Sequence, residues 1–296
     1  MWPNESQTIK DVLICEEEPI TLLQCCPLGL NGKSMATIKS AIRQILNLVP
    51  VGRRQVEAFD RRQEIKIAAQ RLALLGDRAE VFTHHFQNNE WRNEESVSGS
   101  GSTLEYTQNL RAKLPGLLHR LSIRSMLDAP CGDFNWFSRV DLSSGINYIG
   151  ADIVEPLIAQ NRERFSRAGR EFQTLDVVGQ DLPGADLWMC RDCLIHLSHE
   201  EIFSVLANFL KSEIRYLLTT TYPNCPTNYD IPTGSFRQLN LELKPFYLGE
   251  PLERIEDWIE GFPVRQLALW DRDTLAKRLA SNRHFAEHCR SNSLSR

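Results

Sequence analysis

The sequence lacks any long apolar run. No stretch of its 296 residues approaches the roughly 18 consecutive apolar residues that span a bilayer, so we expect no membrane span. We expect no secretory leader either, because Glu16, Glu17 and Glu18 interrupt any apolar segment near the start. The eight cysteines show no spacing typical of a disulfide framework. These absences favour a reducing compartment, and we predict a cytoplasmic protein.

The sequence also lacks a large net charge of either sign. The formal net charge of −4 gives the chain as a whole no electrostatic reason to bind nucleic acid. Residues 31–80 are locally basic, with ten Lys and Arg against five Asp and Glu, and a solvated helical face explains this better than a surface for lipids or polyanions. Cys190 and Cys193 form one C-x-x-C pair, but no second ligand pair has a suitable spacing. We therefore predict neither a nucleic-acid partner nor a metal site.

Hydrophobic periodicity divides the chain into three parts. Residues 1–34 show no period and are predicted to form a flexible tail. Residues 35–103 are predicted to form a helical extension with isoleucines at helical spacing up to about residue 80, followed by a polar stretch that ends in the Ser/Gly loop 98–102. We expect this extension and its loop to cover the functional site of the third part, residues 104–296.

The third part alternates strands and helices. Strands are predicted over 122–128, 147–153, 172–178, 185–192 and 214–223, and helices over 104–121, 155–165 and 199–211. The last helix begins at a capping box of Ser198 and Glu201. Such alternation indicates a parallel sheet with helices on both faces. The predicted fold is therefore α/β, a Rossmann-like doubly wound, mostly parallel sheet with an N-terminal helical extension.

The stretch MLDAPCGDFNWF, residues 126–137, carries the first chemical signal. Asp128 ends the first strand, and a single glycine, Gly132, precedes a second acid, Asp133. Glycine lets the backbone approach a ligand, and ligands of such sheets lie outside the carboxyl ends of the strands. A dinucleotide site needs a G-x-G-x-x-G turn to admit a pyrophosphate, which the two acids here would repel. A cationic ligand with an amino group suits this turn better.

Two further acids follow at equal intervals of 24 residues, from 128 to 152 and from 152 to 176. Asp152 lies at the end of the second strand, where a carboxylate can accept both hydroxyls of a ribose. Asp176 lies late in the predicted third strand, where it can accept from an adenine amino group, and Val177 offers backbone contacts. The interval matches one strand–helix–strand step, so the three acids are expected at one edge of the sheet.

Four segments in this order resemble the motifs of class I S-adenosylmethionine (SAM)-dependent methyltransferases: LDAPCGDF, YIGADI, LDVV and LWMCRDCLIHLS. The first of them lacks the second and third glycines that are usual in the family. The resemblance covers residues 104–290. A bacterial subfamily is also similar, because it carries a W-x3-ES-x-SG-x-GS segment before the fold, which here is residues 91–102.

The resemblance implies SAM as the cofactor. It implies that Asp128 and Gly132 cradle the methionine moiety while Asp133 assists through water. The ribose would lie at Asp152, the adenine at Asp176 and Val177, and the loop 98–102 would close over the methionine carboxylate. The cofactor-binding residues predicted in this way are Asp128, Ala129, Cys131, Gly132, Asp133, Asp152, Ile153, Asp176, Val177, Arg191, Trp91, Ser98 and Gly99.

The catalytic residues are predicted just past the fourth strand. His196 follows Asp192 by four residues, so a short turn between them would let the carboxylate orient the imidazole as a base. A packing or capping role for His196 at the start of the next helix is the alternative.

Residues 219–246 are predicted to form a long loop, and polar side chains typical of a polyol or sugar site recur in it: Asn224, Asn228, Asp230, Arg237 and Asn240. We therefore predict O-methylation of a hydroxylated small molecule or glycan. A non-catalytic SAM-binding protein and an NAD-linked oxidoreductase are the alternatives, and the oligomeric state is left open.

Overall fold

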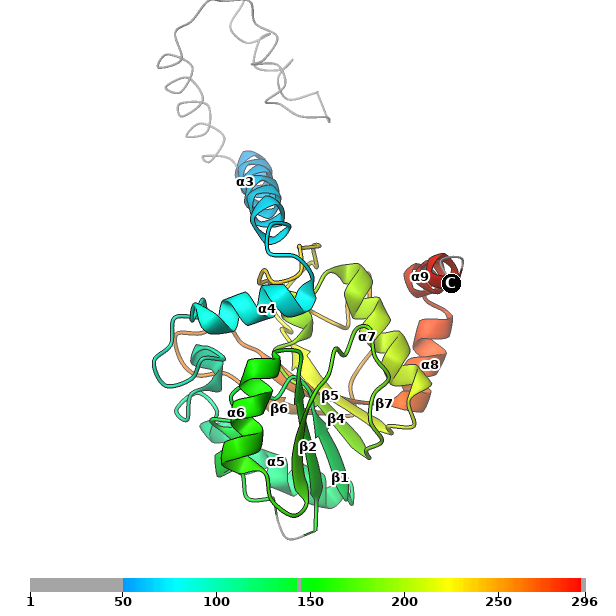
Figure 1. Ribbon diagram of the computed structural model, residues 1–296. Helices are drawn as coiled ribbons and strands as arrows, with labels where there is room; N and C mark the ends of the chain where they lie inside the picture. The colour runs from blue at the N-terminus through cyan, green and yellow to red at the C-terminus, as the bar shows by residue number, and fades with distance from the viewer. Residues whose placement is uncertain (1–49, 143–144, 294–296) are drawn as a thin grey trace, which may run out of the picture. The chain divides into compact units, whose positions relative to one another are not determined.

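The computed structural model describes residues 50–142 and 145–293 (Figure 1). The chain divides into two units, Met1–Gln63 and Glu64–Arg296, and the sheet and the cavity lie in the second. The predicted flexible tail, 1–34, and the predicted helical residues 35–49 lie outside the described residues. Within the described part, no helix is both long and apolar enough to cross a membrane.

The second unit is built on a seven-stranded sheet with the order β3-β2-β1-β4-β5-β7-β6. The five strands from β3 to β5 are parallel, and β7 runs antiparallel to β5 and β6. The predicted Rossmann-like, mostly parallel sheet is thereby confirmed. The strands are β1 Ser125–Asp128, β2 Asn147–Asp152, β3 Arg170–Thr174, β4 Leu187–Cys190, β5 Tyr216–Thr221, β6 Glu253–Glu256 and β7 Gln266–Asp271.

Both faces of the sheet are buried, because alternate residues of the central strands enter two different clusters. In β4, Trp188 belongs to the cluster that contains α7, α8 and α9, whereas Leu187 and Met189 belong to the cluster that contains α5 and α6. The helices are α3 Pro50–Leu72, α4 Arg78–Gln87, α5 Gln108–Arg120, α6 Glu155–Phe165, α7 His199–Lys211, α8 Arg272–Ala280 and α9 Arg283–Ser293. The predicted capping box of Ser198 and Glu201 is present at the start of α7.

Two of the predicted boundaries are wrong for identifiable reasons. The third strand ends at Thr174, not at residue 178, because the Asp176 carboxylate accepts from the backbone N–H of Val178 at 3.0 Å and closes a turn there. The helical region extends past residue 80, because a capping box of Asp77 and Glu80 starts α4, which ends at Gln87. The hairpin of β6 and β7 was not predicted at all.

The strand order reverses between β1 and β4, since β2 and β3 follow on one side and β5 on the other. Ligands of open α/β sheets bind in the crevice at this reversal, outside the carboxyl ends of the strands. Asp128 and Asp152 end β1 and β2 at that crevice, and Asp192 follows β4 there. The topology therefore collects the predicted acids at one edge of the sheet.

Candidate functional site

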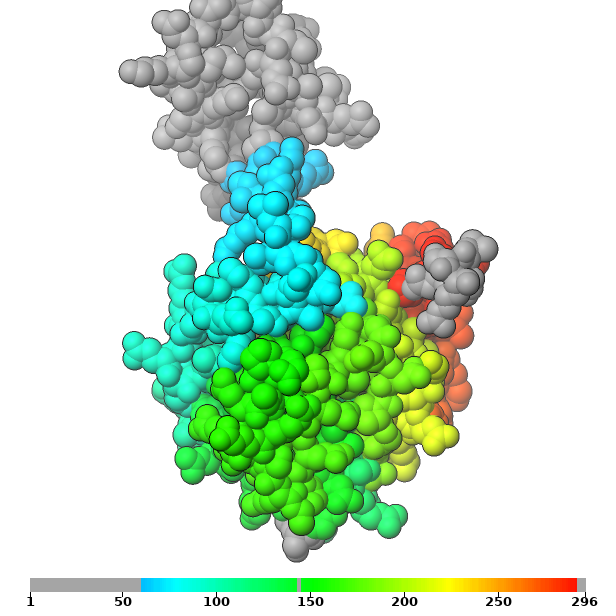
Figure 2. All heavy atoms as spheres, viewed as in Figure 1, coloured from blue at the N-terminus to red at the C-terminus, as the bar shows by residue number. Residues whose placement is uncertain are grey.

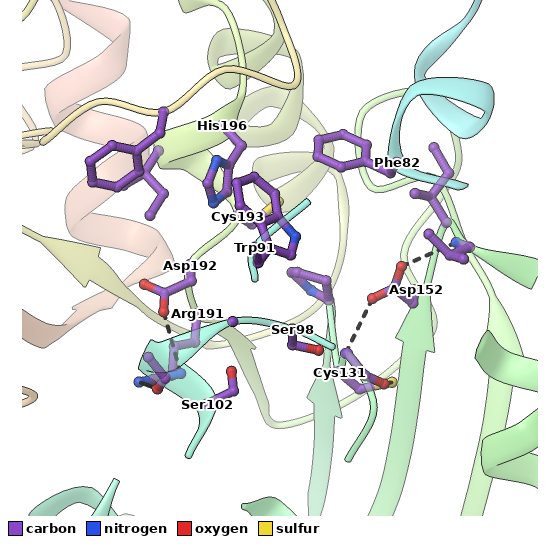
Figure 3. A pocket seen from close by; sticks show the side chains of 18 of the residues that line it. Phe82, Trp91, Ser98, Ser102, Cys131, Asp152, Arg191, Asp192, Cys193 and His196 are labelled. Carbon is purple, nitrogen blue, oxygen red and sulfur yellow. Dashed lines mark hydrogen bonds and ion pairs between the residues drawn. The ribbon is translucent and has the colours of Figure 1, made fainter. Parts of the chain in front are cut away.

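A cavity of about 620 Å³ lies at the carboxyl ends of β1, β2 and β4. All the predicted site residues except Ala129 and Asp133 line it. Figure 3 shows Asp152 on one side of Trp91 and Asp192 on the other. The cavity therefore has two ends, one at the first two strands and one beyond β4.

Helix α4 and the residues after it complete the wall of the cavity. Phe82 and Phe86 from α4 line it together with Trp91. In Figure 2 the cyan atoms of this region lie directly against the green atoms of the sheet and α6. In the described ranges, no group of His, Cys, Asp and Glu side chains is placed to hold a metal ion.

The first turn places a buried carboxylate at the cavity. The Tyr148 hydroxyl donates to Asp128 Oδ2 at 2.6 Å, and Asp128 is 2% exposed. Burial raises the pKa of Asp128 to about 8. Ala129, in contrast, does not line the cavity. Its backbone extends the pairing of β1 with β4, because its N–H donates to the Met189 carbonyl and its own carbonyl accepts from the Trp188 indole.

Gly132 lies where the Ser98 side chain leaves no room for a Cβ. Its φ is +55°, and a Cβ there would lie 2.3 Å from Ser98 Oγ. Its backbone N–H donates to Asp152 Oδ2 at 3.1 Å. The single glycine of the turn thus allows the 98–102 loop and the end of β2 to meet at the same point.

Asp133 fastens the segment 91–102 to this turn and does not line the cavity. Its Oδ2 accepts from the backbone N–H of Val97 at 3.0 Å, and its own N–H donates to Ser98 Oγ at 3.0 Å. Glu95 adds a second attachment, because its Oε1 accepts from the Asn135 amide at 2.8 Å. Asp133 therefore holds the loop, and its water-mediated role toward the methionine moiety stays a prediction.

The glycines of the same segment permit close packing at the cavity. Gly99 has φ +94°, and a Cβ there would lie 3.1 Å from Trp91. A Cβ on Gly101 would lie 3.0 Å from the Arg265 guanidinium and 3.2 Å from the Asp192 carboxylate. The two glycines of the W-x3-ES-x-SG-x-GS segment thus allow close contacts: Gly99 packs on Trp91, and Gly101 packs on Arg265 and Asp192.

Asp152 presents a carboxylate that retains accepting capacity. Its Oδ2 accepts from Gly132 and its Oδ1 from Val154, each at 3.1 Å. Two oxygens offer about four lone-pair positions, so the carboxylate can accept beyond these backbone donors. Burial raises the pKa of Asp152 to about 6, and Ile153 lines the cavity beside it. This arrangement suits a ligand with two neighbouring hydroxyls.

Asp176 is tied to α4 by a residue that we did not predict. Arg78 donates to Asp176 Oδ2 at 2.6 Å and to Glu201 Oε1 at 2.7 Å. Asp176 and Val177 both line the cavity, although they follow β3 and are not part of it. The only sequence signal for Arg78 is its position directly after the helix-capping Asp77, which marks a helix start but no contact partner.

Beyond β4, three buried charged side chains, those of Arg191, Asp257 and Arg265, form one network with the partly exposed Asp192. Arg191 donates to Asp257 at 2.9 and 3.1 Å and to the Gly101 carbonyl at 2.6 Å. Arg265 donates to both oxygens of Asp192 at 2.9 and 2.8 Å. Burial by itself would raise the pKa of Asp192, but Arg265 and Arg191 outweigh it and hold that pKa below its usual range. Asp192 is therefore ionised at neutral pH.

His196 is oriented by a backbone carbonyl. Its Nδ1 lies 2.9 Å from the Ser235 oxygen, which can only accept, so Nδ1 carries the proton and Nε2 is left as an acceptor. The prediction that Asp192 orients this ring is wrong, because the Asp192 carboxylate is bound by Arg265 and Thr220. Burial lowers the pKa of His196 to about 4, so the ring is neutral at pH 7.

The loop 219–246 does not supply the predicted polar wall. Asn228 donates to the carbonyls of Asn240 and Lys244, and the buried Arg237 donates to the Ile195 carbonyl. These side chains hold the loop in shape. From the loop, only Tyr222 and Phe236 line the cavity among the described residues.

No protein-family model matches the sequence, and no curated protein matches it. Among solved structures, the chain is similar to PigF with SAH, with 16% identity and a TM-score of 0.50. The match covers 69% of this chain and 65% of that chain, so this chain spans less than two thirds of its length. The chain is also similar to magnesium protoporphyrin IX methyltransferase (ChlM) from Synechocystis PCC 6803 with bound SAH, with 16% identity over 56% of this chain and 84% of that chain and a TM-score of 0.44. At such identities the likeness to PigF concerns the fold alone, and the fold is the Rossmann-like one that the sequence predicts.

Proposed function

We propose that this protein is a SAM-dependent methyltransferase that methylates an oxygen atom of a hydroxylated small molecule. The observation that carries the proposal is the cavity itself. It brings Asp128, Asp152 and Asp176 together at the reversal of strand order, next to a neutral histidine with an open Nε2. A glycan acceptor loses support, because the predicted polar side chains of the 219–246 loop bind one another and nearby backbone groups and do not line the cavity.

The residues of the first end of the cavity fit SAM better than a dinucleotide. Among the described residues no cation is directly bound to the buried Asp128, and an amino group would stabilise its ionised form. Asp152 can accept from ribose hydroxyls, and Val177 and Asp176 lie where an adenine would follow. A pyrophosphate would face two buried carboxylates, which argues against the NAD-linked alternative.

When bound, SAM supplies a methyl group, whose bond to sulfur breaks with the electron pair left on sulfur as a bond to the acceptor oxygen forms. His196 Nε2 accepts the proton of the acceptor hydroxyl, and the Ser235 carbonyl keeps the ring in the required orientation through Nδ1. The ionised Asp192 favours the imidazolium that results. The chain thus contributes orientation, a proton acceptor and a counter-charge.

Isothermal titration of the full chain with SAM, SAH and NADH tests the proposal. We expect micromolar binding of SAM and SAH and no heat with NADH. Binding of NADH alone would favour an oxidoreductase. Absence of binding heat with all three compounds would remove the basis for a methyltransferase. Either of these results contradicts the proposal.

We expect Arg78→Met to weaken SAM binding about 10- to 150-fold, the range expected when a hydrogen bond to a charged group is lost. The substitution leaves Asp176 without its partner from α4 and detaches that helix from Glu201. Arg254→Met is the matched control, because the Arg254–Glu242 pair has similar exposure and lies outside the cavity. Titration with SAM measures both, and equal affinities of the two variants would show that Arg78 has no part in the site.

A further inference from the structure

We infer that the methyl acceptor is an uncharged aromatic ring that carries a hydroxyl group, bound against Trp91, His196 and Phe236. The inference rests on the proposed function and specifies the substrate class of the same site. It departs from the polyol expected from the sequence, and three sets of observations carry it.

Two aromatic rings, of Trp91 and Phe236, pack against the His196 ring. The ring centroids of Trp91 and His196 are 4.7 Å apart, and those of His196 and Phe236 are 5.8 Å apart. Figure 3 shows Trp91 and His196 side by side in the cavity. Phe236 is 53% exposed and Phe262 is 42% exposed, although both line the cavity. Such flat apolar surface at the edge of a cavity can be covered by a planar ligand.

The polar side chains at this end are engaged with one another. Asp192 accepts from Arg265 through both oxygens and from the Thr220 hydroxyl. Arg191 is occupied by Asp257 and the Gly101 carbonyl. A sugar or polyol would bury several hydroxyls with few partners, and each unpaired hydroxyl weakens binding. A ring with a single reacting hydroxyl needs little more than His196 Nε2.

The charges at this end cancel. Two guanidiniums, of Arg191 and Arg265, face two carboxylates, of Asp192 and Asp257. Tyr106, which also lines the cavity, stays neutral, because burial raises its pKa to about 12. A charged acceptor would be desolvated without gaining a free counter-charge. The network therefore favours an uncharged acceptor.

Ligand-observed NMR on the full chain with saturating SAH tests this inference. The probes are two aromatic alcohols, 2-naphthol and 4-methylcatechol, and two polyols, methyl glucoside and inositol. We expect saturation transfer to the aromatic probes and none to the polyols. Phe236→Ala and Phe262→Ala should each weaken the aromatic probes about 5-fold. Leu252→Ala, at a position that is 59% exposed and outside the cavity, should leave them unchanged.

Three results would overturn the inference: preference for the polyols, no binding of the aromatic probes, or equal binding to wild type and to both phenylalanine variants. The substituted phenylalanines are largely exposed, so loss of folding is not expected to mask the result. Titration of the same samples with SAH separates failure of this inference from failure of the proposed function. If SAH binds and the aromatic probes do not, only the acceptor class is wrong, whereas failure of SAH to bind contradicts the proposed function.

Discussion

Replacing His196 with Gln should lower kcat about 100- to 10,000-fold, the contribution typical of a positioned general base. SAM affinity should change little, because the ring lies beyond β4, at the other end of the cavity from Asp128 and Asp152. Gln retains much of the ring's volume and can still donate to the Ser235 carbonyl, so the fold should persist. Single-turnover kinetics with an aromatic alcohol that binds, together with titration of SAM, measures the two effects separately.

His85 provides a matched control for this substitution. Its ring packs against Trp91 with centroids 5.1 Å apart, and its Nε2 bonds to the Gly234 carbonyl at 3.0 Å. Burial also lowers its pKa, yet His85 does not line the cavity. His85→Gln should therefore destabilise the fold comparably while leaving kcat within about 5-fold of wild type. Equal losses of kcat in the two variants would mean that His196 acts only through packing.

The pH profile gives an independent check of His196. Because burial lowers its pKa to about 4, Nε2 is unprotonated above about pH 5, and kcat should be flat from there to pH 8. An inflection near pH 6.5, the ordinary value for a histidine, would contradict a buried base in this position.

SAM affinity should rise about tenfold for each pH unit between pH 6 and 8, as expected when one group must lose a proton on binding. Burial raises the pKa of Asp128 to about 8, so the free protein holds a proton there that an amino group of the cofactor must displace. Titrations at pH 7 in two buffers of different ionisation enthalpy should show release of close to one proton. Asp152, with a pKa of about 6, should add a further loss of affinity below pH 6.

Asp128→Asn should weaken SAM binding more than about tenfold and abolish most of this pH dependence. Asp181→Asn, at an exposed carboxylate paired with Lys211, is the control and should retain both. A pH-independent affinity in the wild type, or no proton release, would contradict an ionised Asp128 in the bound state.

In the unliganded protein, the same raised pKa makes stability change with pH in the direction opposite to SAM affinity. Burial raises the folded-state pKa of Asp128 to about 8, from a usual value of 3.8, so between these values the folded state binds more protons than the unfolded state. Stability should therefore fall as pH rises from about 4 to 8. Asp128→Asn should be at least as stable as wild type at pH 8, which separates a binding role from a merely structural one.

The sequence was sufficient wherever the signal was local or repeated. Asp128 and Asp152 end parallel strands, and such strands bring their carboxyl ends to one edge regardless of other contacts. Ser198 starts α7 because a capping box needs only residues three apart. The boundary of β3 was missed because the Asp176 side chain competes with the strand pairing for the backbone, which periodicity does not reveal.

The partners of the buried charges depended on contacts distant in sequence. A spacing of four residues suggested that Asp192 binds His196, but Asp192 is bound by Arg265, which lies 73 residues away just before β7. His196 in turn is held by the Ser235 carbonyl, 39 residues away. Likewise, the polar residues of the 219–246 loop were expected to face the acceptor, and they bind one another and nearby carbonyls.

By itself, then, the sequence determined the α/β order of elements, the edge of the sheet at which ligands bind, and the acids that gather there. Only the tertiary structure decided which of those acids remain open to a ligand, which are neutralised by arginines, and which rings surround His196. The physical reason is that strand ends and helix caps are specified by neighbouring residues. A buried charge must instead be paired, and its pairing is specified by whichever opposite charge the whole fold brings within reach.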